Sequence, residues 1–352
     1  MKNQKNIGSV IFIIIFLLML IMPNVIMFFN LESSENNENR EFTSFPVFSL
    51  KNPISFLKEF NTYYSENFGL KTTLVNNYID FKFQVLDETP MPTKVVKGLE
   101  GWYFLGNSYN NTFDNAFGNN NFKTSQLEEI ARRLLEIKSY LKSQNIEFYL
   151  VVPPNKSTIY KEYLPFQLNK NESNLEALKN HLKTEANFEI IDLTKTLLAK
   201  KNKELVYLKT DSHWNEYGAF LGYKETMRII NQDFIIASKE LTDYNLIMKV
   251  RRQGDIVKMI NLSEEESALT FTKKHVNQEA KVQRDIKLFM YFDSFSYAWM
   301  PYFNESFANI EYLNYHSISK QHLANEKPDI IIFEIVERNI DILLKNENLL
   351  VY

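Results

Sequence analysis

The first 30 residues contain the feature that most constrains what this chain can become. Residues 7–29, "IGSVIFIIIFLLMLIMPNVIMFF", are almost wholly apolar, and Lys2 and Lys5 precede them. A helix of about 20 apolar residues crosses the ~30 Å hydrocarbon core of a bilayer. Positive charge before this run and the acidic "ESSENNE" after it favour a cytoplasmic N-terminus. The sequence therefore predicts a single-pass anchor in the cell membrane, with the rest of the chain extracytoplasmic.

A cleaved signal peptide is the alternative interpretation of the same residues. Its apolar run would end near Met22, just before Pro23. However, no small-residue cleavage site follows, and the run exceeds the usual core of about 7–15 residues. We therefore favour an uncleaved anchor, and both interpretations place the working domain beyond the cytoplasmic membrane.

Composition excludes several classes of function. The chain has 352 residues, of which 45% are hydrophobic, so it can bury one sizeable core. A net charge of −3 provides no global field that would recruit nucleic acid. The absence of cysteine excludes disulfides, thiolate metal sites and cysteine catalysis. The five histidines are scattered without a metal-ligand spacing, so we expect no metal site: His181, His213, His275, His316 and His322.

The chain falls into three expected segments. Residues 1–30 are the cytoplasmic tip and the anchor. Residues 31–95 combine a polar tether over 31–50 with a helical juxtamembrane segment over 53–86, which opens on an Asn-Pro start signal. The proline-marked "ETPMPTK" then indicates a boundary, and the main domain occupies residues 96–352.

Short apolar runs organise the main domain. "IEFYLVVPP", "FEIIDL", "IKLFMYF" and "DIIIFEIV" are typical of buried strands, and helical stretches alternate with them. One helix is expected from a capping box of Ser125 and Glu128, with apolar residues at helical spacing up to Leu141. Buried strands alternating with helices predict an α/β fold, in which helices cover both faces of a mostly parallel sheet.

Functional residues in such a sheet gather on loops after the carboxyl ends of strands. Three loops meet this condition: "KTDSHWNEYGA" after an expected strand "ELVYL", "DSFSYAW" after "IKLFMYF", and "ERN" after "DIIIFEIV". They contain the polar residues from which we build the candidate site.

Ser294 is the candidate nucleophile. It follows an apolar strand at an expected strand-to-helix turn, where a serine Oγ is exposed. A serine hydroxyl needs a base within hydrogen-bond reach. His213 is the candidate base, and Asp211 can hold its ring in the correct tautomer. The alternative is that Ser294 simply caps a helix, a position that serine favours.

Several blocks of this chain resemble SGNH hydrolases. "TDSHWNEYGA" resembles their D-x-x-H block, with the D-x-H spacing of the alginate-acetylation branch and the DHHW group, and "YFDSF" resembles their GDS block. "KPDIIIFEIVERN" resembles the strand and loop that follow it. "IEFYLVVPPNKSTIYKEYLP" and "GLEGWYFL" resemble the alginate O-acetyltransferase-like branch. The D-x-H block precedes the serine block, which fits the circularly permuted order of that branch, and the resemblance covers roughly residues 96–345.

This resemblance implies a fold and an activity. The fold is an SGNH-like three-layer α/β/α domain. The activity is that of a bacterial O-acetyltransferase, in which Ser294 carries an acetyl group to hydroxyls of an exported or cell-surface polysaccharide. A membrane-bound O-acyltransferase would deliver the acetyl group, and no cofactor is implied. A carbohydrate acetyl esterase, or an inactive glycan-binding subunit of a polysaccharide assembly complex, remains an alternative.

Two departures from the SGNH pattern concern the oxyanion. Phe292 stands where a glycine is expected, and Arg338 stands where the pattern has an asparagine. The backbone N–H of Ser294 and the guanidinium of Arg338 are the candidate oxyanion donors. Alternatively, Arg338 forms an ion pair with Glu337 or Glu334.

Further residues are candidates for the substrate cleft. Gly254 and the residue after it place another loop near the site. Lys156 and Tyr160 line the cleft or belong to a turn that starts a helix. Trp214 stacks on a sugar ring or packs the loop that holds His213.

Overall fold

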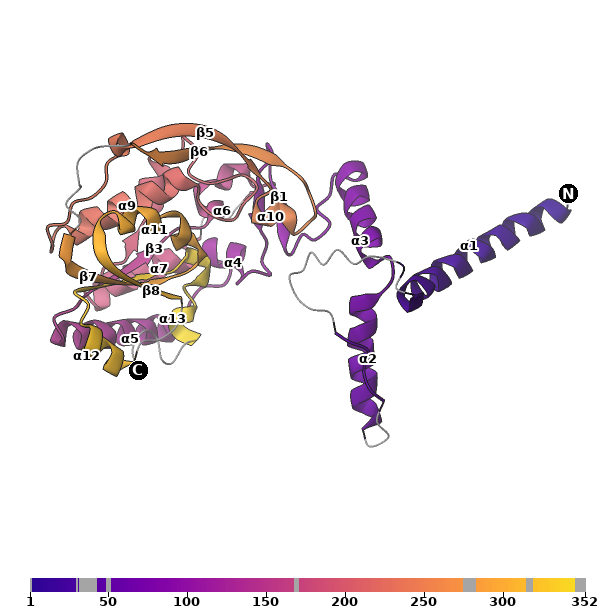
Figure 1. Ribbon diagram of the computed structural model, residues 1–352, viewed down its shortest axis with the longest axis horizontal. Helices are drawn as coiled ribbons and strands as arrows, with labels where there is room; N and C mark the ends of the chain where they lie inside the picture. Colours follow the sequence, from indigo (N-terminus) through magenta and orange to yellow (C-terminus); the bar gives the residue numbers. More distant parts are fainter. Residues whose placement is uncertain are drawn as a thin grey trace. The chain divides into compact units, whose positions relative to one another are not determined.

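The computed structural model (Figure 1) describes residues 2–29, 31, 43–48, 52–167, 171–274, 283–314 and 319–345. The chain divides into two compact units, Met1–Pro90 and Met91–Tyr352. Their boundary lies within the proline-marked "ETPMPTK" segment. The candidate site residues all belong to the second unit.

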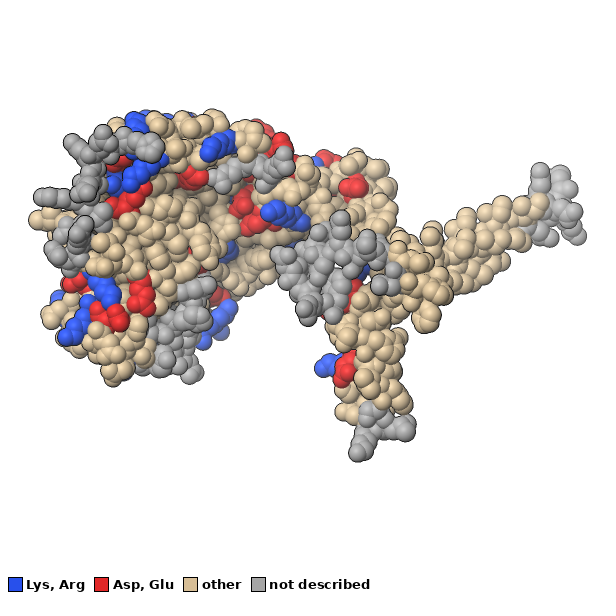
Figure 2. All heavy atoms as spheres, viewed as in Figure 1, with Lys and Arg blue, Asp and Glu red and all other residues tan. Residues whose placement is uncertain are grey.

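The first unit is helical. Helix α1 (Lys2–Phe29) contains a candidate membrane span, Ile7–Phe29, with a mean hydropathy of 2.9. Figure 2 shows no charged side chain along its described surface. The helical segment expected over 53–86 is interrupted: α2 (Pro53–Asn67) is followed by α3 (Lys71–Asp80) and a π-helical turn (Phe81–Val85). Most of the tether predicted for residues 31–50 lies outside the described residues.

Five strands form the main sheet of the second unit. They are β3 (Glu147–Val152), β4 (Ile191–Asp192), β7 (Gln283–Phe292), β8 (Phe307–Asn314) and β9 (Ile330–Glu334). Their order is β4-β3-β9-β7-β8, and every pairing is parallel. The predicted α/β fold with a mostly parallel sheet is confirmed. All five carboxyl ends therefore point to one edge.

Helices cover both faces of this sheet, because its strands are apolar on both sides. Phe148, Leu150 and Val152 belong to one core cluster, with α5 (Thr124–Ser143) and α7 (Asn174–Glu185). Tyr149 and Val151 alternate with them and belong to the other cluster, with α9 (Glu216–Ile230) and α11 (Met300–Asn304). The three-layer arrangement follows from this alternation.

Smaller elements surround the sheet. Two antiparallel pairs lie outside it: β1 (Val95–Lys97) with β2 (Tyr103–Leu105), and β5 (Tyr244–Arg252) with β6 (Glu265–Lys273). The short helices are α4 (Thr112–Ala116), α6 (Lys156–Ile159), α8 (Thr194–Leu198), α10 (Asp255–Lys258), α12 (Lys320–Glu326) and α13 (Ile342–Lys345). The 3₁₀ turns are Lys161–Tyr163, Leu241–Asp243, Ser294–Ala298 and Glu337–Asn339.

Two local predictions were wrong. Helix α5 begins one residue before Ser125: Lys123 is its N-cap, and the Lys123 N–H donates to the Gln126 side chain over 2.8 Å. "ELVYL" forms no strand and contributes only an isolated bridge between Tyr207 and Trp214. The carbonyl groups of Leu208 and Lys209, which follow this bridge, accept hydrogen bonds from the Lys156 side chain.

Candidate active site

Lys156 shapes the loop that carries the D-x-H block. Its buried Nζ donates to the carbonyl oxygens of Leu208, Lys209 and Asp211, at 3.1, 2.9 and 2.6 Å. Burial lowers the pKa of Lys156 to about 8. Because all three of its protons face the backbone, Lys156 supports the loop, and it also lines the small pocket that contains Ser212 and Arg338. Tyr160 is also buried, and its hydroxyl accepts the Val206 N–H over 3.0 Å.

Gly254 and Asp255 brace this loop from another side. A Cβ on Gly254 would lie 2.2 Å from the carbonyl oxygen of Thr210, so only glycine permits this approach. The Asp255 N–H donates to Asp211 Oδ2 over 3.0 Å, and the Ser212 N–H donates to Asp255 Oδ1 over 2.6 Å. Gly254 is therefore a packing residue that lets α10 reach Asp211.

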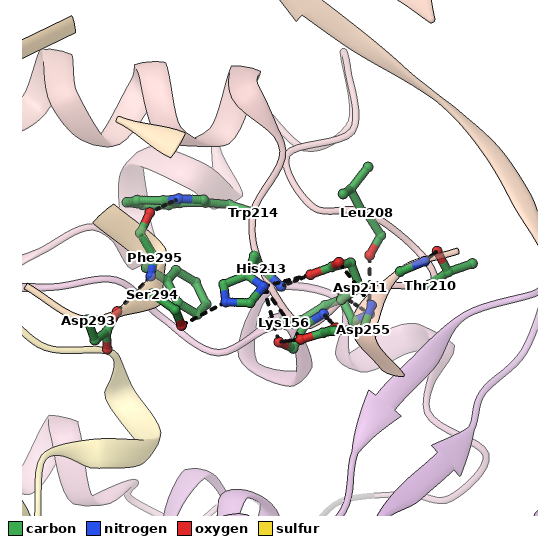
Figure 3. Close-up of polar contacts among 12 residues, drawn as sticks. Lys156, Leu208, Thr210, Asp211, His213, Trp214, Asp255, Asp293, Ser294 and Phe295 are labelled. Carbon is green, nitrogen blue, oxygen red and sulfur yellow. Dashed lines mark hydrogen bonds and ion pairs between the residues drawn. The ribbon is translucent and has the colours of Figure 1, made fainter. Parts of the chain in front are cut away.

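Three side chains form a continuous hydrogen-bonded relay (Figure 3). His213 Nδ1 lies 2.7 Å from Asp211 Oδ1, and His213 Nε2 lies 2.8 Å from Ser294 Oγ. Burial opposes ionisation of Asp211, but hydrogen bonds from the His213 ring and backbone outweigh it and hold the pKa of Asp211 well below its usual range. An ionised Asp211 fixes the proton on Nδ1, which leaves Nε2 free to accept from Ser294.

Ser294 is exposed on a 3₁₀ turn that buried hydrogen bonds of Asp293 hold in place. Asp293 is the N-cap of the 3₁₀ turn: its Oδ1 accepts the Phe295 N–H over 2.8 Å, and its Oδ2 accepts the Val336 N–H over 2.9 Å. Glu334 Oε2 accepts the Asp293 N–H over 2.9 Å. The capping alternative for Ser294 is wrong, because Asp293 fills that position and leaves the serine hydroxyl to His213.

Trp214 packs the site from inside. Its side chain is 2% exposed, and its indole N–H donates to the carbonyl oxygen of Phe295 over 2.9 Å. The Phe295 ring also lies 5.1 Å from the His213 ring. Trp214 therefore ties the histidine loop to the serine turn, and its burial favours the packing alternative over stacking on a sugar.

Arg338 lies against the serine turn without an ion pair. Its guanidinium carbon is 5.2 Å from the centre of the Phe295 ring. The expected carboxylate partners each use one oxygen elsewhere: Glu337 Oε2 accepts the Asn155 N–H over 2.7 Å, and Glu334 Oε2 accepts the Asp293 N–H over 2.9 Å. Among the described residues no salt bridge involves Arg338. It lines a small pocket together with Ser212, Asn155, Ser157 and others.

Sequence reasoning missed two supporting carboxylates. Glu266 accepts the N–H groups of Lys209 and Thr210, at 2.6 and 3.1 Å, although nothing in its strand marks it. Glu334 supports the serine turn and is fully buried, which raises its pKa well above the usual value. A signal existed for Glu334, since it is the one charged residue inside the apolar run "IIIFEIV".

The same cluster has the composition of a metal site. Asp211, His213 and Asp255 each offer one ligand atom, and these atoms lie within 4.8 Å of one another. However, Asp211 is bonded to the His213 ring, and Asp255 Oδ2 accepts from the Ser212 hydroxyl over 2.5 Å. These contacts suit a proton relay through the His213 ring.

The comparisons with known proteins identify the family. The profile of the ALGX family, the SGNH hydrolase-like domain of acetyltransferase AlgX, matches residues 95–291, which is more than half of the chain. The chain belongs to this family of SGNH-like acetyltransferases. The matched region includes Asp211 and His213 and ends just before Ser294.

Two solved structures share the fold, and a third is similar to this chain. Bacillus cereus PatB1 with a sulfonyl adduct has a TM-score of 0.53 and 19% identity, over 70% of this chain and 96% of that chain. PatB1 without the adduct has a TM-score of 0.52 and 18% identity, over 70% of this chain and 96% of that chain. The O-acetyltransferase domain of Pseudomonas putida AlgJ gives 0.49 and 17%, over 72% and 93%. No curated protein matches the chain significantly.

Proposed function

We propose that this protein is an extracytoplasmic O-acetyltransferase that uses Ser294 as its nucleophile. The observation that carries the proposal is the relay from Asp211 through His213 to the exposed Ser294 Oγ, with separations of 2.7 and 2.8 Å. Both distances fall within the range at which a base activates a hydroxyl. Membership of an acetyltransferase family supports an acetyl group as the unit that is moved.

The reaction proceeds in two halves. Ser294 Oγ attacks the acetyl carbonyl of the donor, His213 Nε2 takes the serine proton, and the donor bond breaks as His213 protonates the leaving group. In the second half, a glycan hydroxyl gives its proton to His213 and attacks the acetyl-serine, and Ser294 recovers a proton from His213. Asp211 stays ionised and stabilises the imidazolium in both halves. No cofactor enters either half.

Two donors are available for the oxyanion that forms at the acetyl carbonyl. Among the described residues no hydrogen bond engages the backbone N–H of Ser294. The guanidinium of Arg338 lies beside the serine turn. It forms no ion pair with any residue that the structure describes. Fixed donors of this kind contribute about 10²–10³-fold to acyl transfer.

The proposed acetyl acceptor and acetyl donor rest on the resemblance to the O-acetyltransferase branch and on the apolar helix α1. A polysaccharide outside the cell membrane is the proposed acceptor, and a membrane-bound O-acyltransferase is the proposed source of acetyl groups. The span Ile7–Phe29 supports a membrane location for the enzyme, and the flanking charges support a cytoplasmic N-terminus.

Hydrolysis of a chromogenic acetyl ester tests the serine. We expect Ser294→Ala to lower kcat by at least about 10³-fold, because the nucleophile is lost while binding remains. Ser143→Ala, an exposed serine in the last turn of α5, is the matched control and should keep full activity. Unchanged hydrolysis in the Ser294 variant would refute the proposal.

Adding short glycans to the same assay separates the alternatives. An acetylated glycan detected by mass spectrometry supports the transferase, whereas free acetate alone supports an esterase. A folded protein that neither hydrolyses the ester nor reacts with a serine-directed phosphonate would be an inactive glycan-binding subunit.

A further inference from the structure

A second cavity lies beside α4, separate from the serine turn. Its volume is about 420 Å³, within the usual range of ligand sites. The residues that line it come from the start of the second unit, from α4 and from the loop after α6: Pro92, Thr93, Val96, Asn107, Phe113, Asp114, Phe117, Asn119, Phe166 and Gln167. Nothing in the acyl-transfer relay uses any of them.

Three phenylalanines form the apolar part of this cavity. Phe113 and Phe117 are stacked, with ring centres 5.9 Å apart and an angle of 18° between planes. Phe166 meets Phe113 edge to face at 5.5 Å and 76°, and it leaves 43% of its surface exposed. The negative face of an aromatic ring attracts the polarised C–H groups of a sugar ring. A phenylalanine exposed at a cavity is therefore suited to stack on a pyranose.

The polar part of the cavity contains an acidic side chain, Asp114. Asp114 accepts the side-chain amides of Asn107 and Asn119, at 3.0 and 3.3 Å. None of the described residues that line the cavity is a lysine, arginine or histidine, and no salt bridge among the described residues involves Asp114. An ionised carboxylate has about four acceptor positions, so Asp114 can still accept from hydroxyl groups. The same charge repels uronate and phosphate groups.

Helix α4 connects this cavity to the candidate active site. Phe113 and Asp114 face the large cavity, while Thr112 lines the small pocket that also contains Ser212 and Arg338. The loop before α4 is joined to the turn of Arg338, because Asn110 Nδ2 donates to Asn339 Oδ1 over 2.6 Å. A chain held in the cavity therefore lies across one short helix from the small pocket that Arg338 lines.

We propose that this cavity is an acceptor subsite that holds pyranose rings of a neutral glycan, with Phe166 as the stacking platform and Asp114 as the hydroxyl acceptor. This inference rests on the proposed function and extends it, because it assigns the acceptor to uncharged sugars. A sugar bound in the cavity directs the next residues of the polymer along α4 towards Ser294.

Binding to the full-length protein carrying Ser294→Ala tests the subsite without any acyl transfer. The probes are neutral tetrasaccharides of glucose, mannose and N-acetylglucosamine, together with tetragalacturonate, measured by calorimetry. We expect at least one neutral probe to bind and the uronate to bind at least tenfold more weakly. Phe166→Ala and Asp114→Asn should each weaken the neutral probe by about tenfold.

Ile235→Ala is the control, because Ile235 is 93% exposed and lines neither cavity. It should bind as the parent does. In the otherwise wild-type chain, Phe166→Ala should raise KM for the neutral acceptor, whereas Ile235→Ala should change neither this KM nor the hydrolysis of a small acetyl ester.

Three results would overturn the subsite: no neutral probe binds, the uronate binds best, or binding is insensitive to both Phe166 and Asp114. Because the binding assay needs no active serine, it separates the two proposals. Glycan binding that depends on Phe166 in a protein without transferase activity would retain the subsite and refute the transferase.

Discussion

At the residue scale, Glu337 shows how burial couples the site to pH. Its side chain is almost fully buried beneath the turn of Arg338, and it accepts the Asn155 N–H and the Thr158 hydroxyl, at 2.7 and 2.6 Å. Burial nevertheless dominates and raises the pKa of Glu337 from 4.5 to about 7. Between these two values, the folded protein retains a proton that the unfolded chain has released.

The raised pKa of Glu337 makes the folded protein less stable as pH rises. As pH rises from about 4.5 to about 7, the unfolded chain binds fewer protons than the folded one, so the free energy of unfolding falls by about 3 kcal/mol from this group. Glu337→Gln should remove that loss, since an amide does not titrate. Denaturant unfolding at pH 5 and pH 7.5 measures the difference in the free energy of unfolding. Glu128→Gln is the control, because Glu128 is exposed. An unchanged pH dependence in the Glu337 variant would contradict the expectation.

At the scale of elements, the β5–β6 hairpin supports the loop that contains Asp211. No sequence motif indicates this role. Its two strands pair from Tyr244 with Lys273 to Arg252 with Glu265, and α10 lies in their connection. The hairpin thereby brings the Asp255 N–H to Asp211 and the Glu266 carboxylate to the loop before it. Because one contact holds the Asp211 carboxylate and the other holds the backbone just before it, we infer that the hairpin positions the relay.

Gly254→Ala tests this support. The new methyl group would lie 2.2 Å from the Thr210 carbonyl oxygen and 2.5 Å from the Asp211 nitrogen, so α10 must move away from the loop. We expect kcat for acetyl-ester hydrolysis to fall at least about tenfold, with KM little changed, since the lost geometry acts on the transition state. Gly8→Ala is the control, because no atom lies within 4 Å of a Cβ there. Full activity in the Gly254 variant would show that α10 does not position Asp211.

At the scale of the whole molecule, chain order and spatial order differ. Strand β9 comes last in sequence but lies at the centre of the sheet, between β3 and β7. Residues from both halves of the second unit therefore meet at one edge: Lys156 follows β3, Arg338 follows β9 and Ser294 follows β7. The rotated order of the sequence blocks is compatible with one site because all these strands are parallel.

The absence of cysteine makes the membrane topology directly testable. Single substitutions Asn3→Cys and Ile235→Cys place one thiol on each side of the proposed span, and Ile235 is 93% exposed. With a cytoplasmic N-terminus, a membrane-impermeant maleimide should label Ile235→Cys in cells with a permeable outer envelope and an intact cell membrane. It should label Asn3→Cys only after that membrane is disrupted. The wild-type chain is the unlabelled control, and the reverse pattern would invert the orientation.

The sequence by itself determined the apolar span, the buried strands and the three side chains of the relay. Each of these depends on local pattern: length and hydropathy for the span, continuous apolar residues for the strands, and the D-x-H and Asp-Ser blocks for the relay. The fold class followed as well, because parallel strands buried on both faces require helices on both sides.

Only the tertiary structure decided the roles of the supporting residues. For Lys156 and Trp214 the sequence left open a role at the substrate or a role in local packing, and both side chains are buried and bonded to backbone carbonyls. Glu266 was not assigned any role and Glu334 was considered only as an ion-pair partner of Arg338, although these two carboxylates hold the two loops of the relay. Which side chain satisfies a buried backbone group depends on which segments meet in space, and buried polar groups must find a partner wherever the fold supplies one.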